Sequence, residues 1–170
     1  AHLDATGMQE EAARVRETAT LRPLQVWPTF APARVGFNRL NLELVSSPDR
    51  LEAVNAHDVC VIGCVRNEAA MLPLFLDHYR RLGVRGFLIV DNCSDDATLP
   101  YLLDQPDVAA FASDTAYALT EYGVAWQQAL MANFRAGRWS LVADADEFLV
   151  LPRGVPDLTA LVASDAFAAA

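Results

Sequence analysis

An uninterrupted apolar run from Val59 to Val65 constrains the fold of this 170-residue chain more than any other feature of the sequence. A strand with one face in water alternates apolar and polar residues, whereas a strand covered on both faces of a parallel sheet is apolar throughout. The run is also far too short to cross a membrane as a helix. We therefore predict a central β-strand in a sheet that has helices on both faces.

The segments that follow alternate between helical and strand patterns. Leu72, Phe75, Leu76, Tyr79 and Leu82 recur at helical spacing, and Gly83 comes directly after them, where helices commonly end. The remaining predicted elements are a strand at 87–90, a short helix capped by Asp95 or Asp96, a strand at 108–111, a helix at 121–136 and a strand at 139–143. This alternation predicts an α/β fold, with a doubly wound, mostly parallel, Rossmann-like sheet flanked by helices.

The first 57 residues are less regular than the rest of the chain. Residues 10–20 have the pattern of a polar helix, three prolines then interrupt the chain, and residues 39–45 alternate weakly, as a half-buried strand would. We expect residues 1–57 to be an N-terminal extension packed on the main domain, which spans residues 58–152. Residues 153–170 would begin a further region.

Polar residues follow each predicted strand of the main domain. They are Arg66, Asn67 and Glu68 after the first, Asp91, Asn92 and Ser94 after the second, Asp114 and Thr115 after the third, and Asp144 and Asp146 after the fourth. Because ligands of such sheets bind beyond the carboxyl ends of the strands, we expect a binding site there. Each group alone also has a structural interpretation, with Asn67 and Asp96 as helix caps and Asp91 as a turn residue.

Three acids, Asp144, Asp146 and Glu147, stand between two apolar segments within 139–152. Partly buried carboxylates cost several kcal/mol unless a cation meets them. The nearest basic residues, Arg138 and Arg153, lie beyond the apolar flanks. Carboxylates in this pattern suit Mg²⁺ or Mn²⁺ held together with a substrate phosphate. The alternative is a purely structural acidic turn or helix cap.

Composition excludes several classes of function. A net charge of -9 argues against nucleic acid or an anionic membrane as the main partner. All thirteen basic residues are arginine, so Schiff-base chemistry and the lysine of a P-loop are excluded. Cys60, Cys64 and Cys93 lack disulfide or zinc spacing, which favours reduced thiols in the cytoplasm. No apolar stretch is long enough to span a membrane.

Three motifs occur in order along the chain: V-R-N-E at 65–68, D-N-C-S-D-D-A-T at 91–98 and D-A-D-E-F at 144–148. Together they resemble the family 2 glycosyltransferases of the GT-A fold, and in particular a bacterial subgroup with R-N-E, D-N-x-S-x-D-x-T and D-x-D-E-F motifs. The resemblance covers about residues 59 to 152. It implies a metal-dependent enzyme that transfers a sugar, of the hexosyl type, from a nucleoside-diphosphate sugar to a glycan, polysaccharide or other hydroxyl acceptor.

The resemblance also implies roles for individual residues. Val65, Arg66, Asn67 and Glu68 would begin the nucleotide site, and Asp91 would hold the base and ribose with Asn92, Ser94 and Asp96 around it. Asp144 and Asp146 would form the metal motif. Of these two, the resemblance implies that Asp146 would be the direct ligand of Mn²⁺ or Mg²⁺, and that Asp144 would also contact the ribose or sugar. Glu147 would assist either.

The chain departs from the family pattern after Pro152, where about eighteen residues remain. Family members continue with an acceptor-binding half that contains the general base, so we expect a fragment with the donor half and assign no base. Asp157, Asp165 and the helical His78 are poor candidates. The alternatives are a non-catalytic nucleotide-sugar-binding module and a nucleotidyltransferase, although the latter needs a glycine-rich loop that residues 66–68 lack.

Overall fold

The computed structural model describes residues 40–164 and residue 167; the helix predicted at 10–20 and the prolines after it lie outside these residues. The described part contains a five-stranded sheet in the order β1-β4-β3-β2-β5. Its strands are β1 (Glu43–Leu44), β2 (Val59–Val65), β3 (Phe87–Asp91), β4 (Val108–Ala112) and β5 (Trp139–Val142). The last four are parallel, and β1 adds to β4 in the antiparallel direction. The prediction of an α/β fold with a mostly parallel sheet is confirmed.

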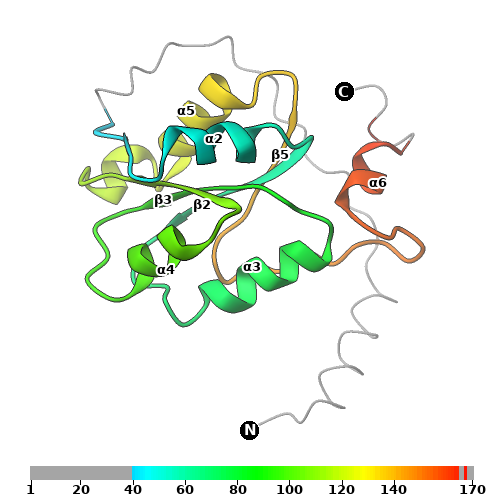
Figure 1. Cartoon of the computed structure of the whole chain (residues 1–170), viewed down its shortest axis with the longest axis horizontal. Coiled ribbons are helices and arrows are strands. Elements are labelled where there is room, and N and C mark those ends of the chain that lie inside the picture. Colours follow the sequence, from blue (N-terminus) through cyan, green and yellow to red (C-terminus); the bar gives the residue numbers. More distant parts are fainter. Residues whose placement is uncertain (1–39, 165–166, 168–170) are drawn as a thin grey trace, which may run out of the picture.

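Helices cover both faces of the sheet (Figure 1). The helices are α2 (Pro48–Asn55), α3 (Leu72–Arg81), α4 (Thr98–Asp104), α5 (Val124–Phe134) and α6 (Leu158–Val162), with a 3₁₀ turn η2 (Tyr117–Thr120). α2 and α5 lie on one face, and α3 and α4 lie on the other. The chain runs from β2 to β3 to β4 and then returns to place β5 on the other side of β2. This reversal creates a topological switch point between β2 and β5.

The side chains of β2 explain why its sequence is apolar throughout. Val59, Val61 and Val65 contribute to the core that packs under α3 and α4. Cys60 and Ile62 contribute to the second core, under α2 and α5, which also contains the fully buried Trp126. Each fully buried large side chain contributes roughly 1.5–3 kcal/mol. Both cores meet at β2, so a polar residue within this strand would be costly on either side.

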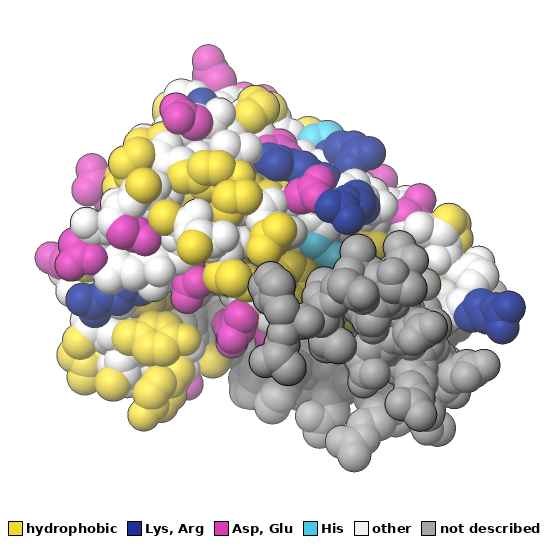
Figure 2. All heavy atoms as spheres, turned by 90° about the horizontal axis from the view of Figure 1, so that it is seen from below, with side chains coloured by type: hydrophobic (Ala, Val, Ile, Leu, Met, Phe, Trp, Pro, Cys, Tyr) yellow, Lys and Arg dark blue, Asp and Glu magenta, His cyan; other side chains and the backbone are white. Residues whose placement is uncertain are grey.

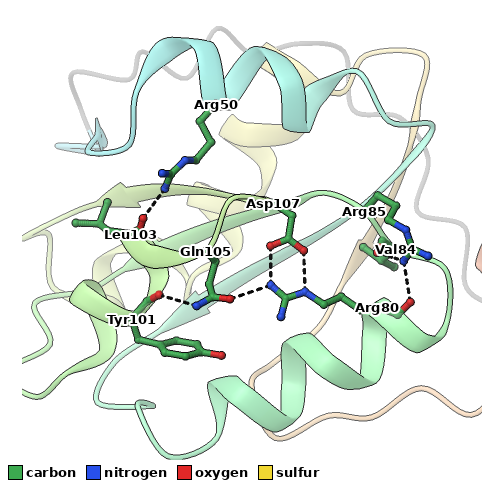
Figure 3. Close-up of polar contacts among 8 residues, drawn as sticks. All are labelled: Arg50, Arg80, Val84, Arg85, Tyr101, Leu103, Gln105 and Asp107. Carbon is green, nitrogen blue, oxygen red and sulfur yellow. Dashed lines mark hydrogen bonds and ion pairs between the residues drawn. The ribbon is translucent and has the colours of Figure 1, made fainter.

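A polar network fixes the C-terminal end of α3 against the turn that leads into β4 (Figure 3). The guanidinium of Arg80 donates from Nε and Nη2 to the two carboxylate oxygens of Asp107, at 2.7 and 2.6 Å, and Nη2 also donates to Gln105. Arg50 of α2 donates to the carbonyl of Leu103 across the edge of the sheet. A bidentate arginine–carboxylate pair has a defined geometry, so it sets the position of α3 relative to the sheet.

The element boundaries differ from the sequence prediction in three places. α5 begins at Val124 and not at 121, because Glu121, Tyr122 and Gly123 all have positive φ. α4 has Ala97 at its N-cap position, although the Asp96 carboxylate accepts from the amide of Thr98. The weak pattern at 39–45 contributes only the two residues of β1, because Asn41 has a positive φ.

α2 was not predicted at all, although its start has clear signals. Ser47 is the N-cap and accepts from the amide of Arg50, and Pro48 and Asp49 follow in the first turn. The helix buries only Val54, so it lacks the apolar periodicity on which the prediction relied. Among the described residues, no helix combines the length and the apolar character that crossing a bilayer would need.

Candidate functional site

The carboxyl ends of the four parallel strands lie in a row along one edge of the sheet. Asp91 is the last residue of β3, and Asp114, Arg66 and Asp144 follow β4, β2 and β5. The spatial order of these strands is β4, β3, β2 and β5. Neighbouring strands are about 4.8 Å apart, so the row is roughly 14 Å long. The topology therefore brings together four segments that are far apart in the sequence.

A cleft of about 740 Å³ lies beside the ends of β3 and β4. Its lining includes Asp91, Ser94 and Asp114, together with Asn41 from the segment before β1. The amide of Asn41 donates to the carboxylate of Asp114 at 2.9 Å, which fixes this wall of the cleft. Arg66, Asn67, Asp144 and Asp146 lie outside the lining of the cleft, farther along the same edge.

The segment before β1 is attached to the edge through one carbonyl group. The carbonyl oxygen of Leu40 accepts hydrogen bonds from the hydroxyl of Ser113 at 2.7 Å, the hydroxyl of Thr115 at 3.0 Å and the indole of Trp126 at 3.3 Å. Sequence reasoning did not connect this segment with the site. Its contribution depends on contacts between residues more than seventy positions apart, which no local pattern reveals.

Asp91 is the most unusual residue of the cleft, because its carboxylate is buried and only half satisfied. The residue is 3% exposed. Its Oδ2 accepts from the amide of Ser94 at 3.1 Å, whereas Oδ1 is buried and has no hydrogen-bond partner among the described residues. A buried acceptor left without a donor costs about 1–3 kcal/mol. A ligand that donates an N–H or O–H to Oδ1 would recover that free energy.

The loop after β2 and the loop after β3 are joined by four hydrogen bonds between side chains and backbone amides. The amides of Asn67, Glu68 and Ala69 donate to Ser94 Oγ, Thr98 Oγ1 and Asp96 Oδ2, and the amide of Asp95 donates to Asn67 Oδ1. Their lengths are between 2.8 and 3.2 Å. The segments that contain the V-R-N-E and D-N-C-S-D-D-A-T motifs are therefore joined to each other by hydrogen bonds.

These hydrogen bonds also account for the electrostatics of Asp96. Its pKa is lowered, chiefly by the hydrogen bond from the Thr98 hydroxyl and further by the amides of Thr98 and Ala69, all of which favour the charged carboxylate. Asn67 adopts a left-handed conformation, with φ of 58°, to bring its side chain to this position. Asn67, Ser94 and Asp96 thus each use side-chain oxygen atoms in contacts within the protein.

Asn92 is also occupied internally. It is 5% exposed, and its side-chain amide donates to the carbonyls of Ser113 at 2.8 Å and Thr115 at 3.0 Å. Its backbone amide donates to the carbonyl of Val65. Asn92 therefore connects the ends of β2, β3 and β4 at the position directly after Asp91.

Arg66, in contrast, is exposed, and its side chain is not used in polar contacts within the described part of the protein. Its guanidinium makes no hydrogen bond or ion pair with any described residue. The ion pairs in the described part join Arg80 of α3 to Asp107 before β4, and Arg81 to Asp77 within α3, so neither involves Arg66. On the face seen from below, several basic side chains lie together with an acid among them, and other basic and acidic side chains are scattered over the face (Figure 2). Arg66 is thus available to an anion.

The three acids after β5 lie in one turn, where their negative charges repel one another. Asp144, Asp146 and Glu147 are all exposed. The amide of Glu147 donates to the carbonyl oxygen of Asp144 at 2.9 Å, and the amide of Asp144 donates to the carboxylate oxygen Oε2 of Glu147 at 3.4 Å. The pKa of Asp144 is raised, first by partial burial and then by the charges of Glu147 and Asp146. No described ion pair reaches any of the three. A cation would remove this repulsion, so the residues fit a metal ion.

Protein ligands alone would not complete such a site. Among the described residues, no group of three His, Cys, Asp or Glu side chains has an arrangement that could hold a metal ion. Mg²⁺ characteristically binds one or two carboxylates and completes its shell with water and substrate phosphates. The acidic turn fits that kind of shared coordination.

The acidic turn has close neighbours on β2 and η2. A Cβ on Gly63 would lie 3.1 Å from the carbonyl oxygen of Ala143, so glycine permits the end of β5 to approach β2 closely. Burial and the charge of Asp144 raise the pKa of Cys64 to about 12, and the same two causes raise the pKa of Tyr117. Tyr117, 43% exposed, was missed by sequence reasoning, because nothing in its segment marks it.

Neither of the late acids is a free base among the described residues. The carboxylate of Asp157 is the N-cap of α6 and accepts from the amide of Ala160 at 2.7 Å. Asp165 lies outside the described residues. His78 packs against Phe148 and bonds to the carbonyl of Leu149, as expected for a packed histidine.

The chain is similar in sequence to curated glycosyltransferases. It is 28% identical over 125 residues to a glycosyltransferase family 92 protein of Oryza sativa subsp. japonica, an alignment that covers 65% of this chain and 20% of the relative. It is 26% identical over 126 residues to a glycosyltransferase family 92 protein of Ricinus communis, with 69% and 22% covered. The chain thus spans about a fifth of the length of these relatives. No protein-family model and no solved structure matches the chain.

Both relatives are named as glycosyltransferases, and this chain is similar to a part of each. The relatives have a different family number from the family that the motifs resemble. The similarity therefore supports the class, and the family 2 assignment and the metal remain expectations from the motifs.

Proposed function

We propose that this chain is the donor-binding part of a metal-dependent glycosyltransferase. It would bind a nucleoside-diphosphate sugar at the carboxyl edge of the sheet, for transfer of the sugar to a hydroxyl group of a glycan, polysaccharide or other acceptor. The observation that carries the proposal is the buried Asp91, which lines a cleft large enough for a nucleoside and whose Oδ1 has no hydrogen-bond donor among the described residues. The similarity to glycosyltransferases supports the same class.

Each exposed or unsatisfied group of the edge receives a role in this proposal. Asp91 accepts a hydrogen bond from a base N–H or a ribose hydroxyl inside the cleft. Arg66, which has no partner among the described residues, faces the phosphates. Asp144 contacts the ribose or sugar, and Glu147 stabilises the turn through the amide of Asp144. Asn67, Asn92, Ser94 and Asp96 act indirectly, because their side chains hold the two loops and Asp91 in place.

Asp146, with Asp144, would hold Mn²⁺ or Mg²⁺ in the company of the diphosphate. A divalent cation at this position supplies Lewis-acid stabilisation of the negative charge that develops on the departing nucleoside diphosphate. The finer assignments, namely the GT-A fold family, family 2 and hexosyl transfer, belong to this proposal. So does a cytoplasmic location, which the three free thiols favour.

The proposal is tested by calorimetry with a panel of uridine, guanosine, cytidine, thymidine and adenosine diphosphates. One diphosphate should bind in Mn²⁺ at least tenfold more tightly than in chelator, because the acids of the edge repel an uncompensated diphosphate. A sugar ester of that nucleotide should bind to the same site. Equal affinity in Mn²⁺ and in chelator would refute the metal, and no binding by any member of the panel would refute donor binding.

A further inference from the structure

The C-terminal half of α3 makes a set of contacts with the residues immediately after the acidic turn. The hydroxyl of Tyr79 donates to the carbonyl of Glu147 at 3.0 Å and accepts from the amide of Leu149 at 3.3 Å. The neighbouring His78 approaches the carbonyl of Leu149 with Nε2 at 2.9 Å. Because a carbonyl oxygen only accepts, His78 Nε2 carries the proton in this contact.

These contacts fix the backbone on both sides of Phe148. The Tyr79 hydroxyl bridges Glu147 and Leu149, and the ring of Phe148 packs on the His78 ring with the centroids 5.2 Å apart. Tyr79 itself is 1% exposed, and its ring packs against Phe75 at 4.9 Å. A buried tyrosine has few rotamers available, so its hydroxyl offers a defined point of attachment.

The acidic turn needs such an attachment. Asp144, Asp146 and Glu147 lie within four consecutive positions of one turn, so their like charges repel one another. Neither of the ion pairs in the described region reaches the turn. Without an external hold, electrostatic repulsion would favour conformations in which the three carboxylates separate. The contacts from α3 oppose that separation through the backbone, and they leave the carboxylates free.

We propose that Tyr79 and His78 are positioning residues that hold the acidic turn in a conformation ready for the metal–diphosphate group. Neither touches the ligand; both act through the backbone of residues 147–149. The inference rests on the proposed function for what the turn binds, and on the hydrogen bonds alone for how the turn is held.

The test compares Tyr79→Phe, which removes one hydroxyl from a ring that stays packed, with Tyr122→Phe, which removes an exposed hydroxyl that bonds to no described residue. The first measurement is hydrogen exchange at the amide of Leu149. Tyr79→Phe should accelerate it, and Tyr122→Phe should leave it unchanged. Unchanged exchange in Tyr79→Phe would overturn the inference, whether or not the protein binds nucleotide.

The second measurement is the ratio of nucleoside-diphosphate affinities in Mn²⁺ and in chelator, with the diphosphate of the panel that binds best. Loss of one neutral hydrogen bond corresponds to roughly a 2- to 12-fold effect, so the ratio should fall by that factor in Tyr79→Phe while the affinity in chelator stays constant. His78→Gln, which keeps an N–H donor, should retain more of the ratio than His78→Phe. A constant ratio together with faster Leu149 exchange would mean that the contacts are only structural.

The two failures are distinguishable. If the parent chain shows no Mn²⁺ dependence with any diphosphate, the proposed function is wrong about the metal, and Leu149 exchange still decides whether α3 holds the turn. If the parent shows the dependence and Tyr79→Phe keeps it in full, the positioning role is wrong and the proposed function stands.

Discussion

Replacement of Asp91 should separate its role in binding from its role in the fold. Asp91→Ala removes the hydrogen bond from the Ser94 amide to Oδ2, which is worth about 1.5–3 kcal/mol because the acceptor is charged. It also removes Oδ1, a buried acceptor whose missing donor costs about 1–3 kcal/mol. Since the two effects oppose each other, the free energy of unfolding should change by less than about 2 kcal/mol.

The effect on the ligand should be larger and in one direction. If a nucleotide donates to Oδ1, its loss should weaken binding by about 1–3 kcal/mol, or roughly 5- to 150-fold in Kd. Asp91→Asn should weaken binding at least as much, because an amide group that turns its N–H atoms toward the ligand opposes the ligand's own donor.

The assay combines urea denaturation, for the free energy of unfolding, with calorimetry in Mn²⁺, for Kd. Asp95→Ala is the matched control, because the exposed Asp95 contributes only its backbone amide to the loop contacts. The reasoning would be refuted by an Asp91→Ala protein that binds as tightly as the parent. An Asp91→Ala protein that fails to fold while the control folds would assign Asp91 a structural role.

Four further outcomes are expected. Asp96→Asn should destabilise the chain at pH 6, because a carboxyl whose pKa is lowered in the folded state stabilises that state above the unfolded pKa. The difference from the parent should begin to shrink as pH falls below about 3.8 and should vanish below the still lower folded pKa; a difference that persists in strong acid, measured by urea denaturation, would contradict this. Gly86→Ala should cost about 1–3 kcal/mol, because the added Cβ would lie 2.7 Å from the Val54 carbonyl oxygen, and an unchanged urea midpoint would be inconsistent with that contact. Asp146→Ala should abolish the Mn²⁺ dependence of nucleotide binding in calorimetry and leave the affinity in chelator intact. The purified chain should bind a nucleotide sugar without multiple-turnover transfer to added glycans, measured by mass spectrometry, since no general base is assigned; sustained transfer would make Glu147 or Asp157 the base to test.

Local sequence patterns were sufficient wherever one interaction dominates the local structure. β2 was located to the residue, because a strand buried on both faces leaves seven consecutive positions without polar side chains. The end of α3 followed from Gly83, whose φ of 89° is a conformation that other residues seldom adopt. α5 was placed three residues too early, because the left-handed conformation of Glu121 and Tyr122 depends on packing and not on their own preference.

The candidate site shows the same division. The sequence identified the acidic turn and the polar residues after each strand, because parallel strands must end at a common edge. It did not show which of these residues face a ligand. Asn67, Ser94 and Asp96 have the composition of a binding loop, yet their polar atoms are used between the two loops. Asp91 and Arg66 remain unsatisfied, and only the contacts around them reveal it.

By itself, then, the sequence determined the α/β class, the positions of the parallel strands and the acids at their ends, because these depend on hydrophobic periodicity and on the rule that parallel strands share an edge. The tertiary structure decided the order β1-β4-β3-β2-β5, the hold of Tyr79 on the acidic turn and the burial of Asp91. Each of these arises from contacts between residues distant in the chain. Such contacts are selected by the packing of the whole domain, and a local pattern carries no information about them.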